Sequence, residues 1–201
     1  MSGAVHKTAG DEELVAACRR GDASAFEGLV LRHQRMLFNV ALRMTGSRED
    51  AADMVQDAFI AAWKRLGEFR GEARFSTWVT AIVVNLSRNR IQQNSIREKR
   101  VAYSLNAPLP DCDGEIHPDP PGTGPTALEQ LEEAELRQMV QQCIDKLEQG
   151  FREVLVLRDM QELSYEEVGT ALQLREGTVK SRLFRARDAV KECLRRAVGT
   201  S

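Results

Sequence analysis

The sequence predicts an all-α protein in which two small helical domains are joined by a flexible linker rich in Pro, Gly and Asp. Two observations lead to this fold class. Apolar residues make up 42% of the chain but aromatic residues only 5%, and Ala, Leu, Arg and Glu are abundant while strand signals are scarce. All six prolines lie between Asn106 and Pro125, and apolar residues recur at helical spacing on both sides of that stretch.

At 201 residues the chain has room for two small domains. The predicted parts are a disordered N-terminus (1–11), an N-terminal helical domain (12–101), the linker (102–125), a C-terminal domain with a helix-turn-helix (126–197) and a tail (198–201).

Composition excludes several classes of protein. No apolar run could cross a bilayer and the N-terminus lacks an apolar signal-peptide core, so we expect a cytoplasmic protein without membrane insertion. The four cysteines are widely separated, which is typical of reduced thiols. No phosphate-binding loop or nucleophile motif occurs, and Cys112 with His117 would supply too few ligands for a stable zinc site. We therefore expect no enzyme activity, metal, cofactor or small-molecule substrate.

The first strongly periodic helix starts with a capping-box pattern, Ser24 to Glu27, and stops at Gly46. Ser47 is placed to cap a second helix that ends near Gly67. The buried face of this second helix is expected to hold Ala51, Val55, Ala58, Phe59, Ala62 and Leu66. Its other face presents Asp50, Asp53, Gln56 and Asp57, which either bind cations of a partner or are simply solvated.

A third long helix is expected to start near Ser76, after the polar loop "FRGEARFS". Its apolar positions are Trp78, Val79, Ile82, Val83 and Leu86. For Trp78 this periodicity favours a place in the core. Beyond Leu86 the helix continues into a polar and basic stretch, "SRNRIQQNSIREKR".

The C-terminal half begins with a helix over about Leu128 to Leu147 and a shorter one over about Phe151 to Asp159. Ser164 and Glu167 then form a second capping box. Gly169 would let a second helix cross closely, and Gly177 falls in the expected turn. After the turn, the buried seam is expected to be Val179, Leu183, Ala186 and Val190.

The opposite side of that last helix is basic. It carries Lys180, Ser181, Arg182, Phe184 and Arg185. Two short helices, a tight turn and donors on the exposed face predict a helix-turn-helix, whose second helix enters a major groove of DNA. A solvated basic helix that merely ends a bundle is the alternative.

Charge is unevenly distributed, although the formal net charge is only −2. Residues 175–201 carry 8 Lys and Arg against 3 Asp and Glu, and residues 1–100 carry 16 against 12. The stretch between them is acidic. Two basic zones indicate two contacts with a polyanion, while the acidic remainder opposes indiscriminate binding to nucleic acid.

The segment "LSYEEVGTALQLREGTVKSRLFRARDAV" resembles the last helices of extracytoplasmic-function (ECF) sigma factors of bacterial RNA polymerase, within the sigma-70 family. The blocks "GDASAFEGLVLRH", "DAADMVQDAFIAAWKRL", "FRGEARFSTWVTAIVVNLSRNRI" and "REVLVLRDMQELSYEEV" resemble the other parts of that family in the same order. The resemblance extends from about Glu12 to Arg196. Arg175, Glu176 and Gly169 depart from the family pattern.

This resemblance implies a factor that binds core RNA polymerase, directs it to promoter DNA and is held inactive by an anti-sigma factor. The helix Asp50 to Trp63, with Asp50, Asp53, Gln56 and Asp57, would bind the polymerase. The −10 element would be bound as single-stranded DNA by Arg70, Arg74, Ser76, Asn85, Arg88 and Asn89. The motif from about Tyr165 to Phe184, with Lys180, Ser181, Arg182, Phe184 and Arg185, would bind the −35 element.

A free-standing helix-turn-helix regulator that binds duplex DNA as a dimer is the second function that fits the C-terminal half. Such a regulator needs neither the Asp50–Trp63 helix nor the loop before Ser76. The presence of both favours the sigma factor.

Overall fold

The computed structural model describes residues 9–102 and 127–199 of the protein. Every regular element in these two ranges is a helix, which confirms the predicted all-α class. None of these helices is long and apolar enough to cross a membrane. The predicted linker lies almost wholly outside the described residues, as do residues 1–8 of the predicted disordered N-terminus.

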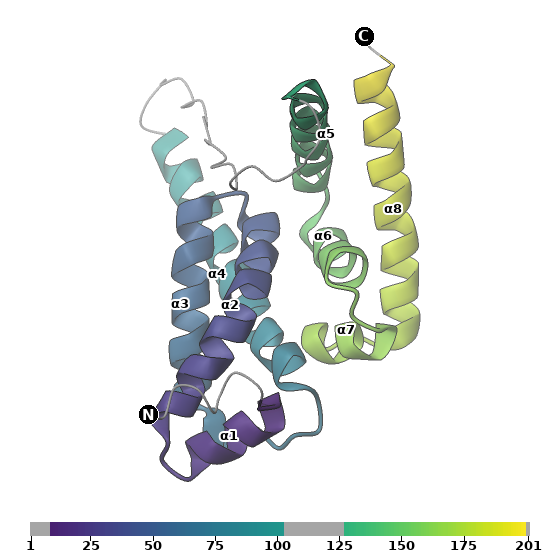
Figure 1. The fold of residues 1–201 in the computed structure, drawn as a ribbon. Coiled ribbons are helices and arrows are strands. Elements are labelled where there is room, and N and C mark those ends of the chain that lie inside the picture. The colour runs from purple at the N-terminus through teal and green to yellow at the C-terminus, as the bar shows by residue number, and fades with distance from the viewer. Residues whose placement is uncertain (1–8, 103–126, 200–201) are drawn as a thin grey trace.

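Four α-helices and one short turn make up the N-terminal domain (Figure 1). Helices α2, α3 and α4 pack against one another, and α1 packs against α2. The apolar seam includes Leu29 and Leu37 of α2, Ala58 of α3 and Val83 of α4, each with no exposed surface. The elements are α1 (Asp11–Arg19), α2 (Ala23–Thr45), α3 (Arg48–Lys64), the 3-10 turn η2 (Leu66–Glu68) and α4 (Phe75–Ala102).

The helix boundaries of this domain follow mostly from local chemistry. Gly46 takes a left-handed conformation (φ 72°) at the end of α2, and the Ser47 side chain accepts a hydrogen bond from the Asp50 backbone N–H, as expected. The Ser24 capping box is wrong. Asp22 caps α2 instead, because its carboxylate accepts both the backbone N–H (3.0 Å) and the hydroxyl (2.6 Å) of Ser24.

Two further differences concern segment ends. Helix α3 stops at Lys64, before the expected Gly67, because the chain tightens into a 3-10 turn over Leu66–Glu68. Helix α1 begins at Asp11, inside the range expected to be disordered. The Glu13 carboxylate accepts the Gly10 N–H at 3.2 Å and caps this helix, and the Asp11 carboxylate lies 2.6 Å from Arg32 and 2.8 Å from His33, which ties the start of α1 to α2.

The C-terminal domain is built on the long helix α8, which packs against α5, α6 and α7 (Figure 1). Its elements are α5 (Ala127–Asp145), α6 (Gln149–Leu155), the π-helical turn η3 (Val156–Met160), α7 (Tyr165–Leu172) and α8 (Glu176–Val198). The buried side chains include Ile144, Val154, Leu157 and Val168. This domain also touches the first one, since α7 packs against α4, and α2 contacts both α5 and α6.

The expectation of reduced thiols is wrong for two of the four cysteines. Cys143 of α5 and Cys193 of α8 form a disulfide across a sequence separation of 50 residues, with their Cα atoms 5.7 Å apart. Packing of α5 against α8 brings the two residues together, which their spacing in the sequence does not reveal. Cys18 is a free, buried thiol whose pKa is raised by burial and by nearby Asp22. Cys112 lies outside the described residues.

Reduction of the disulfide should destabilise the C-terminal domain, because the bond limits the conformational freedom of the unfolded chain. For a loop of 50 residues the loss is expected to be about 4 kcal/mol at most. Urea unfolding with and without dithiothreitol measures it. Cys193→Ser should unfold early under both conditions, and Cys18→Ser should keep the wild-type response. Equal unfolding free energies with and without reductant would contradict a stabilising role.

Candidate nucleic-acid and protein interfaces

The helix-turn-helix predicted from Ser164 onward is present as α7, a short turn and α8. The capping box is confirmed: Glu167 accepts the Ser164 N–H at 2.8 Å, and Ser164 Oγ accepts the Glu167 N–H at 3.1 Å. Gln173 ends α7 in a left-handed conformation (φ 56°). A Cβ on Gly169 would lie 2.8 Å from the Leu174 carbonyl oxygen, so this tight turn leaves no room for any side chain there and favours glycine.

Helix α8 presents its two sides as predicted. Val179, Leu183 and Ala186 are buried and Val190 is half-buried. Gly177, which was expected in the turn, lies instead in the first turn of α8. Four of the five side chains predicted to bind DNA point to solvent; these are Lys180, Ser181, Phe184 and Arg185. Phe184 has 74% of its surface exposed, which is unusual for an aromatic residue outside an interface.

The remaining predicted residue, Arg182, is half-buried. Its Nη1 atom would lie 3.0 Å from a Cβ placed on Gly150, so its side chain extends along α6. Gly150 therefore leaves room for the guanidinium beside α6. Arg182 is a weaker candidate for direct base contacts than Arg185.

The exposed cations Lys180 and Arg185 of α8 differ in their ion pairs. Lys180 pairs with Glu176 at 2.5 Å, which raises the pKa of Lys180, and its ammonium lies 5.2 Å from the Tyr165 ring centre. Arg185 makes no ion pair with any residue that the structure describes. Arg185 is thus open to a DNA phosphate or base, whereas Lys180 must first leave Glu176.

The residues predicted to bind the −10 element do not share one environment. Arg70 and Arg74 are exposed in the loop before α4, Asn85 and Asn89 are exposed on α4, and Ser76 is half-buried in its first turn. Arg88 is different, because it donates two hydrogen bonds to the buried carboxylate of Glu153 in α6, at 2.6 and 2.5 Å. These bonds raise the pKa of Arg88.

Trp78 is half-buried and packs on two phenylalanines, with ring centres 5.1 Å from Phe69 and 5.8 Å from Phe75. Phe69 and Phe75 are themselves buried. This cluster closes the end of the loop over α4. Its position agrees with the core role that the periodicity favoured.

Only part of the acidic face of α3 is exposed to solvent. Asp53, Gln56 and Asp57 are exposed. Asp50 instead accepts hydrogen bonds from Arg90 (2.6 Å) and Asn94 (3.1 Å), and only 16% of its side chain is exposed. Asp50 therefore joins α3 to α4, and the exposed acidic surface consists of the other three residues.

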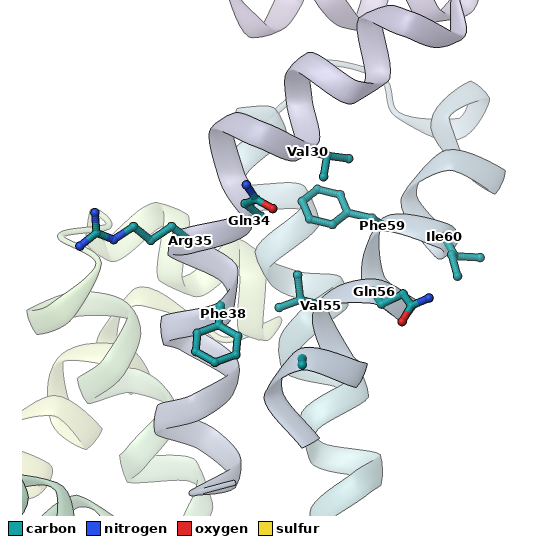
Figure 2. A pocket seen from close by; sticks show the side chains of 9 residues that line it. Val30, Gln34, Arg35, Phe38, Val55, Gln56, Phe59 and Ile60 are labelled. Carbon is teal, nitrogen blue, oxygen red and sulfur yellow. The ribbon is translucent and has the colours of Figure 1, made fainter. Parts of the chain in front are cut away.

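Next to this acidic surface runs an apolar groove that the sequence reading missed (Figure 2). Helix α2 contributes Val30 and Phe38, and α3 contributes Val55, Phe59 and Ile60, with Gln56 at the edge. Ile60 and Trp63 are 45% and 43% exposed. The sequence contained a signal for exposed apolar surface, since Ile60 and Trp63 are apolar but fall outside the buried apolar stripe of α3. A groove of this kind, bordered by polar side chains, is typical of a protein-docking surface.

No group of three or more His, Cys, Asp or Glu side chains is placed to hold a metal ion within residues 9–102 and 127–199. The candidate interfaces among the described residues are a basic helix-turn-helix, a surface with exposed arginines in the loop before α4 and exposed amides on α4, and an acidic and apolar surface on α3.

Comparison with known proteins shows the family to which the chain belongs. Residues 29–96 match the sigma-70 region 2 family, and residues 137–190 match sigma-70 region 4. The chain is 34% identical to the RNA polymerase sigma-H factor of Pseudomonas aeruginosa over 92% of its length and 93% of that protein. It is 35% identical to the ECF RNA polymerase sigma-E factor of Escherichia coli, over 90% and 92% of the two chains. The protein is an ECF sigma factor.

Two solved structures share the fold. CnrH, solved in complex with the cytosolic domain of CnrY, is 27% identical, with a TM-score of 0.64 over 92% of this chain and 96% of that one. RpoE of Bartonella quintana, solved with the anti-sigma factor NepR, has the same fold at 24% identity, with a TM-score of 0.62 over 85% and 96% of the chains. The two matched regions of this ECF sigma factor contain α4 as far as residue 96, and α7 with α8 as far as residue 190.

Acidification should loosen the N-terminal end of α7. The pKa of Glu167 is lowered because its carboxylate accepts the Ser164 backbone N–H, with added help from Arg74 and Thr77. A carboxylate whose pKa is lower when folded stabilises the fold fully above its ordinary pKa of about 4.5, and this contribution is lost as the pH falls through the lower folded value.

Urea unfolding between pH 7 and pH 3 tests this expectation. Glu167→Gln should show a flatter decline in unfolding free energy than the wild type, because glutamine keeps the capping box but cannot titrate. The neighbouring Glu166→Gln is the matched control and should follow the wild type. Identical pH profiles for wild type and Glu167→Gln would contradict the assignment.

Proposed function

We propose that this ECF sigma factor binds core RNA polymerase through α3 and the groove beside it, directs the enzyme to promoters, and helps open their DNA in the cytoplasm. It performs no catalysis of its own. The observation that carries the proposal is the exposed set Ser181, Phe184 and Arg185 on the second helix of a helix-turn-helix, in a chain whose N-terminal domain offers a separate protein-docking surface.

The α7–α8 unit is proposed to read the −35 element as duplex DNA. A helix of this size fits a major groove, where an Arg fork can bond guanine and an aromatic edge can touch a thymine methyl group. Arg185 and Phe184 are exposed and suited to these two contacts. Ser181 and Lys180 are suited to phosphates.

The α4 surface is proposed to bind the −10 element once its strands separate. Asn85 and Asn89 are exposed amides that can bond base edges, while Arg70 and Arg74 are exposed cations for the backbone. Each domain alone would bind DNA weakly. Mounted together on the polymerase, the two contacts reinforce each other through a high effective concentration.

The α3 surface is proposed to dock on the polymerase, with Asp53, Gln56 and Asp57 pairing with its cations and Ile60 and Trp63 burying apolar area. Membership in the family further supports control by an anti-sigma factor that covers these surfaces. The structurally similar sigma factor RpoE of Bartonella quintana was solved with the anti-sigma factor NepR bound.

Run-off transcription tests the promoter-reading role. Purified core polymerase with this protein should give discrete new transcripts from a pool of genomic fragments, and the start sites should share two upstream elements. Arg185→Glu should lower transcription from these promoters about tenfold or more, because a lost base contact costs about 1–3 kcal/mol and a carboxylate adds repulsion. Lys191→Glu makes the same charge change on an exposed residue of α8 beyond the motif and should stay near wild type.

The competing function gives the opposite pattern. If core polymerase gains no new start sites while the protein alone shifts a specific duplex as a dimer, it is a free-standing helix-turn-helix regulator. The α3 assignment would then be wrong as well.

Polymerase docking has its own test. Asp57→Lys reverses an exposed charge beside the groove and should weaken binding of the protein to core polymerase about tenfold, because it removes an attraction and adds a repulsion. Biolayer interferometry with immobilised core enzyme measures the affinity. Glu27→Lys, the same change at an exposed position of α2, is the matched control. Equal affinities of Asp57→Lys and wild type would place the docking surface elsewhere.

A further inference from the structure

Helix α8 begins with an acidic residue, at the point where a recognition helix reaches the bases. Glu176 is the first residue of α8, and its side chain is 55% exposed. Glu176 also departs from the family pattern, so the resemblance gives it no role. In a helix-turn-helix, the N-terminal residues of the second helix contact base edges in the major groove. The side chain at this position therefore bears on which sequence the helix accepts.

Glu176 is paired with a cation that the proposed function assigns to DNA. Its Oε1 atom lies 2.5 Å from the Lys180 ammonium, one turn further along α8. The same ammonium lies 5.2 Å from the centre of the Tyr165 ring at the start of α7. Glu176, Lys180 and Phe184 follow at a spacing of four residues, so they share one side of the helix. The ion pair thus lies on the same side as the exposed ring of Phe184.

A carboxylate at this place opposes the binding of DNA in two ways. Phosphates repel it, and it occupies the ammonium that would otherwise bind a phosphate. Moving Lys180 to a phosphate takes from Glu176 its partner in the ion pair. The exchange is favourable where the DNA also offers a hydrogen-bond donor to the carboxylate, and unfavourable where the carboxylate meets only acceptors.

The chemistry of the bases decides which DNA offers that donor. A carboxylate only accepts hydrogen bonds, and the donors in the major groove are the N4 amino group of cytosine and the N6 amino group of adenine. In adenine the N7 acceptor lies beside the amino group and repels a carboxylate. Cytosine presents no acceptor in that groove. Glu176 is therefore suited to cytosine.

We propose that Glu176 is a specificity-determining residue of the helix-turn-helix, whose carboxylate accepts a hydrogen bond from the N4 amino group of one cytosine in the −35 element and so releases Lys180 to a phosphate. This inference rests on the proposed function, because it deepens the proposed reading of the −35 element. At any other base Glu176 retains Lys180, and the helix loses both the base contact and a phosphate contact. One ion pair thus couples recognition of the sequence to binding of the DNA backbone.

The test uses core polymerase with the full-length protein and a pool of promoters randomised over the −35 element, from which bound templates are recovered and sequenced. Wild type should enrich cytosine about fivefold or more at one position. Glu176→Gln should lose this enrichment and favour adenine there, because an amide can bond both N6 and N7 of adenine. Glu148→Gln, the same change at an exposed residue just before α6, is the matched control and should keep the wild-type preferences.

A second measurement follows the release of Lys180. Because Glu176→Gln frees the ammonium on every sequence, the full-length variant should bind a mixed-sequence duplex more tightly than wild type does. Its plot of log Kd against log salt concentration should be steeper by about 0.9, the value for one added phosphate contact. Lys180→Gln should bind every duplex more weakly but keep the preference for cytosine in the promoter pool.

Identical base preferences of wild type and Glu176→Gln would overturn the assignment and leave Glu176 as an acid that only stabilises the N-terminus of α8. A gain in affinity that is equal for all sequences would also overturn it, because the carboxylate would then merely repel DNA. If the wild-type holoenzyme selects no −35 sequence at all, the proposed function fails and this inference fails with it. If it selects a sequence that Glu176→Gln selects equally, the proposed function stands and only the role of Glu176 is wrong.

Discussion

The buried carboxylate of Glu153 is the interaction on which the arrangement of the two domains depends. Its side chain is 2% exposed, a state that an acid adopts only with its charge balanced and its oxygens hydrogen-bonded. Arg88 of α4 supplies the charge, and Gln149 supplies a further donor. This ion pair joins the face of α4 that carries Arg88 to α6 of the C-terminal domain.

Within each domain, a different constraint shapes the functional surfaces. A helix buries one stripe of side chains and leaves the rest to solvent. In α8 the stripe of Val179, Leu183 and Ala186 is buried, so Lys180, Ser181, Phe184 and Arg185 project outward, while Arg182 lies against α6. In α3 the burial is incomplete: Ile60, which lines the groove shared with α2, and Trp63 are both half-exposed. One helix is therefore suited to DNA and the other to a protein partner.

Local chemistry made much of the fold predictable. The Ser164–Glu167 capping box, the Ser47 cap and the Gly46 stop depend on residues within three or four positions, and each is present. The Ser24 capping box failed because Asp22, two residues earlier, is the better acceptor. Helix α1 was missed although the Glu13 carboxylate accepts the Gly10 N–H at its start, because glycine is a less recognisable cap than serine; Asp11 also contacts Arg32 and His33, which are more than 20 positions away in the sequence.

By itself the sequence determined the helical class, the helix-turn-helix and the outward positions of Lys180, Ser181, Phe184 and Arg185, because all of these follow from a period of 3.6 residues and from short-range caps. Only the tertiary structure decided which polar side chains remain available. Asp50 is bound by Arg90, Arg88 by Glu153, and Cys143 by Cys193, each across 40 or more positions. Periodicity tells which face of a helix a residue occupies, but packing alone decides what covers that face.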